Sequence, residues 1–225
     1  MVLTLAIPPM WPPVRSRVCN GGRVAPVDVR PASRSDIRDL ARVLARAFQD
    51  DPVMAWMLPD GARRARGLPR MFATMTRHHF LAGGGTEVAT RGETVGAAAL
   101  WDPPGRWKQT RREEFLMLPS FILAMGARSA RGQQLTELMK KHHPEEPHWY
   151  LAVIGSDPGV RGGGFGHALM QSRLDRVDAE HAPAYLESSN PDNIPYYLRF
   201  GFEITGEITL PDGGPSMTPM WRAPR

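Results

Sequence analysis

The stretch Val153–Met170 reads V-I-G-S-D-P-G-V-R-G-G-G-F-G-H-A-L-M. An apolar run leads through a proline and several glycines into a segment whose apolar residues recur at helical spacing. The first amides of such a helix have no partner within it, and the helix dipole makes that end positive. Glycines let a phosphate approach these amides, because no side chain stands in the way. The stretch therefore predicts a phosphate-binding loop between a strand and a helix.

Two common phosphate loops do not fit this stretch. The Walker pattern needs Lys-Ser or Lys-Thr after its last glycine, and neither follows when the count starts at Gly159 or Gly162. The dinucleotide pattern G-x-G-x-x-G fails as well, because its last position is His167 or Leu169. The pattern that does match is R-x-x-G-x-G, from Arg161 through Gly166. At this point a glycine-rich turn without a ligand stays open as the alternative.

The segments around the loop predict one α/β (α+β) domain. Strands at Trp149–Ser156 and Ala184–Ser188, joined by a helix over Gly166–Glu180, predict one parallel crossover. The rest of the sheet is expected to be mainly antiparallel, with helices on its faces. Before the crossover we expect a strand at Val27–Arg30, a helix to Phe48 with Ser35 as its N-cap, a helix over Ala62–Phe80, a strand pair Thr86–Thr90 and Thr94–Trp101, and helices Arg112–Ala124 and Ser129–Lys141. After it we expect a helix Ile194–Phe200 and an antiparallel pair, Phe202–Leu210 with Met217–Arg222.

Length and composition fit a single domain. The chain has 225 residues, of which 42% are apolar and 23% charged. Met1–Val27 is rich in proline and glycine, so we expect a poorly ordered extension or an over-long start, and a folded domain over residues 28–225. Cys19 is the one cysteine, which fits a reducing cytoplasm. No stretch approaches the length of a membrane span, so no membrane partner is expected.

The net charge of +5 does not by itself predict nucleic-acid binding. Basic residues are spread along the chain, and the cluster of Arg63, Arg64, Arg66 and Arg70 lacks interleaved aromatic residues. We therefore expect no nucleic-acid partner, and a general attraction for anionic ligands, coenzyme phosphates among them. We expect no metal site, because adjacent histidines on a helix point apart and no cysteine or well-spaced carboxylate completes a tetrahedral set. The histidines considered are His78-His79, and His142-His143 with His148.

With its neighbouring motifs, the loop resembles a known family. The pattern Arg161–Gly166 resembles motif A of the GNAT acyltransferases, whose loop amides hold the pyrophosphate of coenzyme A. The run N-I-P-Y-Y-L-R-F-G-F, Asn193–Phe202, resembles the late Asn…Tyr-x-x-x-Gly-Phe signature of that family. Pro144–Ala152 and the stretch from Leu186 look like the branch that contains puromycin N-acetyltransferase. One departure is Ser156, where the family has an aliphatic residue; Gly155 would ease a local bulge there.

The resemblance implies acetyl-CoA as co-substrate, no metal, and a set of site residues. Tyr197 would protonate the leaving thiolate, with Tyr196 pointing elsewhere or Tyr197 serving only in packing. Glu187 would be the general base, with a surface or ion-paired role as the alternative and Glu146 and His148 as second candidates. The expected coenzyme contacts are Ile154, Gly155 and Ser156 on the strand, Arg161, Gly162, Gly163, Gly164, Phe165 and Gly166 in the loop, and Asn193, which could instead cap its helix.

The expected activity is transfer of an acetyl group to a primary amine of a small molecule, by direct attack in a ternary complex. Two alternatives stay open: a protein or peptide N-acetyltransferase, and a non-catalytic module that binds acyl-CoA. The methionines and tryptophans of Val53–Leu58 and Phe115–Met125 are expected to pack in the core or to line an apolar acceptor pocket. The sequence leaves open a homodimer, the acceptor and the preferred acyl length.

Overall fold

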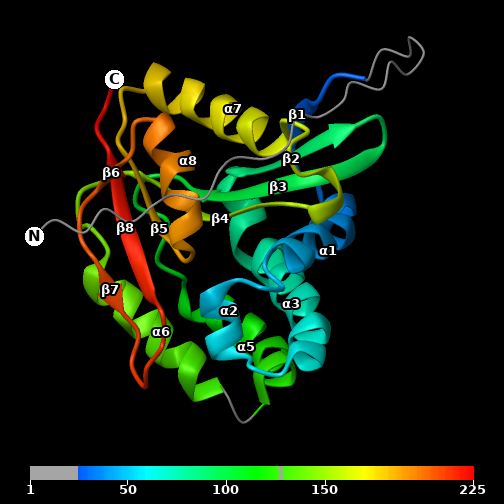
Figure 1. Cartoon of the computed structure of the whole chain (residues 1–225), viewed down its shortest axis with the longest axis vertical. Coiled ribbons are helices and arrows are strands. Elements are labelled where there is room, and N and C mark those ends of the chain that lie inside the picture. The colour runs from blue at the N-terminus through cyan, green and yellow to red at the C-terminus, as the bar shows by residue number, and fades with distance from the viewer. Residues whose placement is uncertain (1–24, 127–128) are drawn as a thin grey trace, which may run out of the picture.

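Figure 1 shows the computed structural model of the chain, which describes residues 25–126 and 129–225. The predicted extension Met1–Val27 therefore lies outside the described residues except for its last three, and the domain boundary stays a prediction. The strands are β1 (Asp28–Pro31), β2 (Thr86–Arg91), β3 (Thr94–Asp102), β4 (Trp149–Ser156), β5 (Ala184–Ser188), β6 (Glu203–Ile204), β7 (Ile208–Thr209) and β8 (Ser216–Arg222). The helices are α1 (Ile37–Ala47), α2 (Pro52–Met57), α3 (Gly61–Met75), α4 (Leu81–Gly83), α5 (Arg111–Met125), α6 (Ser129–His142), α7 (Phe165–Ala179) and α8 (Ile194–Arg199).

The strands form one mixed sheet in the order β1-β2-β3-β4-β5-β8-β6, and β7 pairs with the other end of β8. Only β4 and β5 pair in parallel; every other pair among the described strands is antiparallel. The connection between the parallel strands is α7, as the glycine-to-helix pattern predicts. The predicted fold class is therefore confirmed. Separately, none of the described helices is long and apolar enough to cross a bilayer.

Two apolar cores lie on the two faces of the sheet. Helices α1 and α3 pack on one face, where Leu44 and Phe72 meet Val153 of β4. Helices α7 and α8 pack on the other, where Leu169 and Tyr197 meet Leu151 of the same strand. Figure 1 shows the sheet between these two helical layers. Strand β4 is thus covered on both faces, which is why it reads as a continuous apolar run.

The start of α1 differs from the prediction. The chain enters the helix through a short 3-10 turn, Arg34–Asp36, and the cap is built from Ser33 rather than Ser35. The backbone N–H and the hydroxyl of Ser33 donate to the Asp36 carboxylate at 2.8 and 2.7 Å, and Arg30 donates to it at 2.7 and 2.9 Å. Hydrogen bonding by Arg30 holds the pKa of Asp36 well below its usual range. The carboxylate thereby ties β1 to α1.

The predicted strand Phe202–Leu210 is wrong, because it is broken into β6 and β7. At the break, both the backbone N–H and the hydroxyl of Thr205 donate to the carbonyl of Pro219, at 3.0 and 3.2 Å. Pro219 has no N–H to return a bond, so the antiparallel ladder cannot continue past this point.

Met117 and Met125 of helix α5 are buried, as predicted for the methionines of this segment. Phe115 is 75% exposed and Leu123 is 67% exposed, so the outward side of α5 faces solvent. The alternative, that this segment lines an acceptor pocket, stays a prediction.

Candidate functional site

The central feature of the site is an opening between β4 and β5. The two strands pair only over Trp149–Leu151 and Ala184–Leu186. On its other edge β4 pairs with β3, where Trp101 lies opposite Leu151 but Leu100 lies opposite Val153, so Ala152 is an extra residue. Such a bulge bends the strand that carries it. The bend follows directly after the last parallel pair, and β4 separates from β5 there.

The bulge does not lie at Ser156, so the predicted position is wrong. Ile154, Gly155 and Ser156 pair regularly with Ala99, Ala98 and Ala97 of β3. Their edge toward β5 has no strand partner in the part of the chain that the structure describes. Backbone amides and carbonyls on that edge are therefore available to a ligand.

Gly155 has a packing role. A Cβ at this position would lie 2.8 Å from the Cβ of Ala47 and 3.2 Å from Leu44, both on α1. The missing side chain lets α1 approach β4 closely, which fixes the helix against the free part of the strand.

The glycine loop connects β4 to α7. The Asp157 carboxylate accepts from the Gly159 N–H at 2.8 Å, and a 3-10 turn over Pro158–Val160 follows. Gly162 has φ of +78° and Gly164 has φ of +84°, a left-handed conformation that glycine adopts without strain. Gly164 is the N-cap of α7, so the amides of the next three residues have no acceptor inside the helix. The loop has the free donors that a phosphate needs.

Phe165 fixes the loop from below. Its side chain is 3% exposed and packs in the core beneath α7, so only its backbone faces the loop. The guanidinium of Arg91 lies 4.9 Å from the centre of the Phe165 ring, and it donates to the Gly163 carbonyl at 3.2 Å. A single arginine from β2 thus holds both the ring and the loop.

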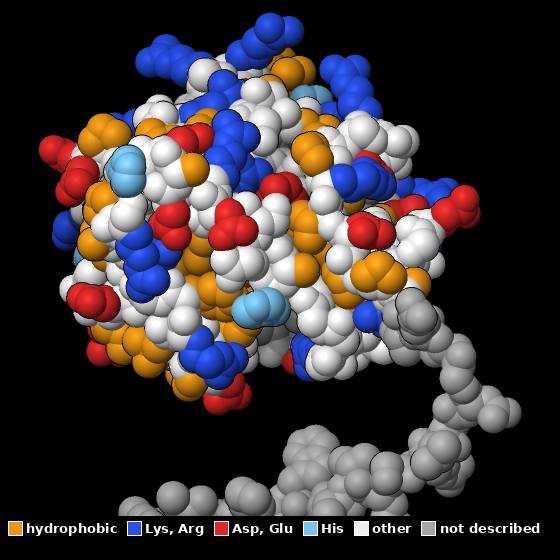
Figure 2. Space-filling model, turned by 90° about the horizontal axis from the view of Figure 1, so that it is seen from above, with side chains coloured by type: hydrophobic (Ala, Val, Ile, Leu, Met, Phe, Trp, Pro, Cys, Tyr) orange, Lys and Arg blue, Asp and Glu red, His pale blue; other side chains and the backbone are white. Residues whose placement is uncertain are grey.

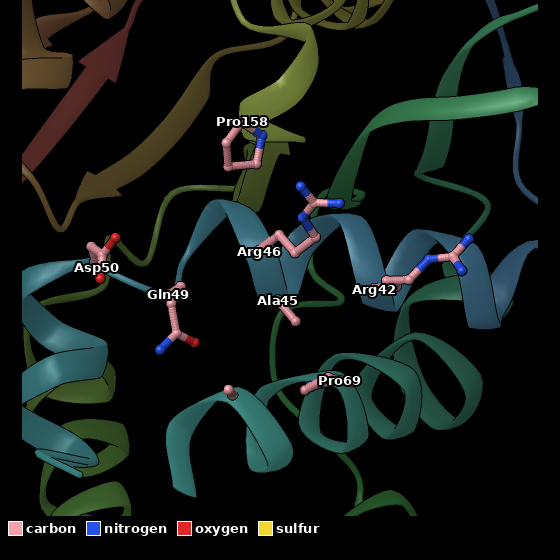
Figure 3. A pocket seen from close by; sticks show the side chains of 8 residues that line it. Arg42, Ala45, Arg46, Gln49, Asp50, Pro69 and Pro158 are labelled. Atoms are coloured by element: carbon pink, nitrogen blue, oxygen red, sulfur yellow. The ribbon is translucent and has the colours of Figure 1, made fainter. Parts of the chain in front are cut away.

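Basic side chains of α1 lie near the same loop. A hollow of about 440 Å³ lies between α1, α3 and Pro158. Figure 3 shows Arg42 and Arg46 on its α1 side. The Nη1 of Arg46 lies 3.2 Å from the Asp157 carboxylate, and Arg161 is exposed. Figure 2 shows Lys and Arg side chains mixed with Asp and Glu side chains over one face of the molecule. The hollow is lined by Arg42, Ala45, Arg46, Gln49, Asp50, Ala65, Pro69 and Pro158.

The two tyrosines of α8 have different surroundings. Tyr197 is buried, and burial, then the charge of Asp51, raises its pKa. The phenol therefore keeps its proton until a strong base forms beside it. The hydroxyl of Tyr196 lies by the start of α7: a Cβ on Gly166 would be 3.5 Å from it and 3.5 Å from the Ser156 hydroxyl. Tyr196 thus lies against the predicted phosphate loop.

Asn193 precedes α8 and is exposed. Its side chain makes no capping hydrogen bond, so the alternative role as a helix cap is wrong. Its predicted contact with the coenzyme stays a prediction.

Asp51 lies close enough to Tyr197 for its charge to raise the pKa of the phenol, and sequence reasoning missed it. It is 8% exposed, its Oδ1 accepts from the Met54 N–H at 3.0 Å, and its Oδ2 accepts from the Ser189 hydroxyl at 2.5 Å. The second bond joins the start of α2 to the end of β5. The available signal is Asp51-Pro52, an N-cap residue followed by proline at the first helical position.

Glu187 is the first residue of β5 beyond the last pair with β4. Its side chain is 1% exposed, so the alternative surface role is wrong. Its Oε1 lies 3.7 Å from Nδ1 of His143, a residue that sequence reasoning named only in rejecting a metal site. Of the second candidates, His148 is buried beside His143, and Glu146 is exposed. Within the described residues, no group of three or more histidines, cysteines and carboxylates is placed to hold a metal.

The sequence of this chain is similar to those of known acetyltransferases. The family model "Acetyltransferase (GNAT) family" matches residues 46–202. An N-acetyltransferase of Schizosaccharomyces pombe, described as uncharacterized, is 27% identical over 188 residues, which are 78% of this chain and 74% of the relative. A mycothiol acetyltransferase of Saccharomonospora viridis is 29% identical over 106 residues, 43% of this chain and 34% of that protein.

Among solved structures, one from Corynebacterium glutamicum is described as "histone acetyltransferase HPA2 and related acetyltransferase". It has 27% identity and a TM-score of 0.69, and the match covers 88% of this chain and 97% of the other. A polyamine N-acetyltransferase of Drosophila melanogaster shares the fold, with 16% identity, a TM-score of 0.55 and coverage of 88% and 100%. The family model spans more than half of the chain, and the glycine loop and the opened strand lie within it. The chain therefore belongs to the acetyltransferase (GNAT) family.

Proposed function

We propose that this acetyltransferase moves the acetyl group of acetyl-CoA to a primary amine of a small molecule. The observation that carries the proposal is the bulge at Ala152, because it opens β4 from β5 beside the glycine loop. Amide donors for a thioester and for a diphosphate then lie along one continuous piece of backbone. Cys19 is the only cysteine and lies outside the matched region, which favours direct attack in a ternary complex over an acyl-cysteine route.

The residues fit acetyl-CoA. Ile154, Gly155 and Ser156 offer the free edge of β4 to the pantetheine and the thioester carbonyl. Arg161 through Gly166 offer the pyrophosphate a loop in which a Cβ at Gly162 or Gly164 would meet no atom within 4 Å, so the approach is open. Asn193 is proposed as a further contact at the start of α8, and the charges of Arg42 and Arg46 attract the phosphates.

Two side chains carry the proton steps. Glu187 takes a proton from the acceptor ammonium, which gives the nitrogen a lone pair with which to attack the thioester carbonyl. When the carbon–sulfur bond breaks, Tyr197 donates its phenolic proton to the thiolate. Burial of both groups limits exchange of these protons with water.

A small acceptor is favoured by the depth of Glu187, since a carboxylate with 1% of its side chain exposed is reached more easily by a slender amine than by a folded protein. The names of similar proteins include both kinds of acceptor, a histone acetyltransferase and a mycothiol acetyltransferase. A peptide panel run beside an amine panel decides between these classes. The puromycin N-acetyltransferase branch, the cytoplasmic location and a homodimer stay predictions.

The activity test is release of coenzyme A from acetyl-CoA in the presence of an amine panel. We expect Tyr197→Phe to lower kcat at least about tenfold, the low end of general-acid effects. We expect its affinity for acetyl-CoA, measured by calorimetry, to stay at the level of the wild type. Tyr196→Phe is the matched control and should retain kcat at saturating acetyl-CoA. Unchanged kcat in Tyr197→Phe removes Tyr197 from the mechanism, and wild-type protein that binds acetyl-CoA without turnover is a binding module.

A further inference from the structure

A buried cluster of titratable groups surrounds Glu187. His143 follows α6, His148 precedes β4, and Glu187 belongs to β5, so three separate segments meet here. The two histidines approach each other at 3.0 Å between their Nε2 atoms, and Nδ1 of His148 donates to the Glu146 carbonyl at 2.6 Å. Trp107 stacks on His143 with ring centres 3.8 Å apart, which shields the cluster from water. All three side chains are buried.

When both histidines of this cluster are neutral, one acceptor nitrogen has no hydrogen to accept. A carbonyl only accepts, so His148 carries its proton on Nδ1, and burial lowers the pKa of this histidine and keeps it neutral. Its Nε2 is then an acceptor, so His143 must donate from Nε2. A neutral His143 is left with a lone pair on Nδ1, which faces Oε1 of Glu187 at 3.7 Å. Two acceptors face each other, and one added proton between them satisfies both.

The other groups around this pair do not supply that proton. Tyr150 of β4 and Tyr185 of β5 lie beside it, and burial, then the charge of Glu187 and hydrogen bonding to it, raises the pKa of both phenols. Both phenols therefore keep their protons, and a phenol that only donates a hydrogen bond to Glu187 transfers no proton to His143. Asp102 of β3, whose charge also acts on Tyr150, is paired with His79 at 3.1 Å.

We propose that Glu187 and His143 act as one proton acceptor in the transfer reaction, with His148 holding His143 in the tautomer that leaves Nδ1 free. This rests on the proposed function, in which Glu187 is the base. The N–H bond of the acceptor ammonium breaks, the proton passes to the Glu187 carboxylate, and a new N–H bond forms at Nδ1 of His143. The amine keeps the electron pair and attacks, and the proton leaves the pair to solvent after product release. His143 is a positioning residue, because it acts through Glu187.

The plain alternative is that His143 only fills space under Trp107. The two roles differ in how the loss depends on pH. Loss of a proton acceptor lowers kcat/KM at a pH where the acceptor amine is protonated. It has no effect at a pH where the amine binds in its neutral form. A packing defect lowers activity to the same degree at every pH.

The test compares kcat/KM of His143→Gln with the wild type from below neutral pH to above the pKa of the acceptor amine. The matched control is His142→Gln, an exposed neighbour whose Nδ1 pairs with the Leu138 carbonyl. We expect a loss of about tenfold or more near pH 7 that shrinks toward wild-type values in alkali, and no loss in the control. A pH-independent loss, or none, overturns the proposal. If Glu187→Gln loses activity and His143→Gln does not, Glu187 stands as the base without His143.

Nuclear magnetic resonance of the imidazole nitrogens tests the pair without turnover. In the wild type we expect His148 as the Nδ1–H tautomer and His143 as the Nε2–H tautomer, with Nδ1 of His143 free toward Glu187. The opposite tautomer of either histidine overturns the proposal. The experiment gives a result even if His143→Gln fails to fold or the wild type has no turnover, so the failure of the inference and of the proposed activity are separate outcomes.

Discussion

Gly96 of β3 lies under the first residue of α7, and its replacement by alanine is a sharp test of how the loop is held. A Cβ at Gly96 would lie 2.4, 2.7 and 2.9 Å from three carbons of the Phe165 ring. Ordinary contact starts near 3.4 Å, so the ring would have to retreat by about 1 Å. The ring is buried and is covered by the Arg91 guanidinium, so it has little room to move.

The expected magnitude follows from this crowding. Overpacking a core costs about 1–3 kcal/mol. For a domain of this length each kcal/mol lowers the melting temperature by about 2–4 °C, so Gly96→Ala should unfold about 2–12 °C below the wild type. Phe165 directly follows the N-cap of α7, and Arg91 joins its ring to the Gly163 carbonyl. Movement of the ring should therefore disturb the loop amides and weaken acetyl-CoA binding.

Thermal unfolding and calorimetry with acetyl-CoA measure the two effects. Gly206→Ala is the control, because a Cβ there would meet no atom within 4 Å and the residue is outside the left-handed region. Equal melting temperatures for the two variants would refute the packing reasoning. A destabilised Gly96→Ala that binds acetyl-CoA as tightly as the wild type would refute the link from Phe165 to the loop.

Two further predictions concern charge and backbone conformation. Asp36→Asn should destabilise the protein at neutral pH, because hydrogen bonds from Arg30 lower the folded-state pKa of Asp36. A lowered pKa gives stability that is present above the unfolded value, about 3.9, and is lost as the pH falls through the folded value. The deficit of the variant, measured as melting temperature, should shrink below about pH 4; a constant deficit would contradict the assignment. Gly164→Ala should cost about 1–2 kcal/mol in urea unfolding, because its φ of +84° strains an alanine although no atom would touch the new Cβ. The same variant should bind acetyl-CoA more weakly, and unchanged affinity would show that the Gly164 conformation does not set the loop.

The sequence predicted the elements that depend on local pattern. The limits of β4 and β5 agree residue for residue with the prediction, because apolar runs bounded by proline, glycine and polar residues mark them directly. The glycine loop and the parallel crossover follow from the same local signals.

The parts that sequence reasoning missed depend on distant contacts. Asp51 and Ser189 are 138 residues apart, and His143, which follows α6, meets Glu187 of β5 across 44 positions of the sequence. The bulge at Ala152 has no glycine or proline to mark it, since it arises from the register between β3 and β4. Exposure of Phe115 likewise depends on which neighbours cover α5, and composition does not reveal this.

The extra residue at Ala152 also decides which way every later side chain of β4 faces. Ala152 and Val153 are consecutive, yet both pack toward α1 and α3, and Ile154 then packs toward α7. Side chains of a regular strand alternate, so a chain shorter by one residue here would turn Val153 out of its core and reverse the positions after it. It would also let β4 continue its pairing with β5 and close the opening between the two strands. The proposed acetyl-transfer site of this chain therefore depends on one extra residue in β4.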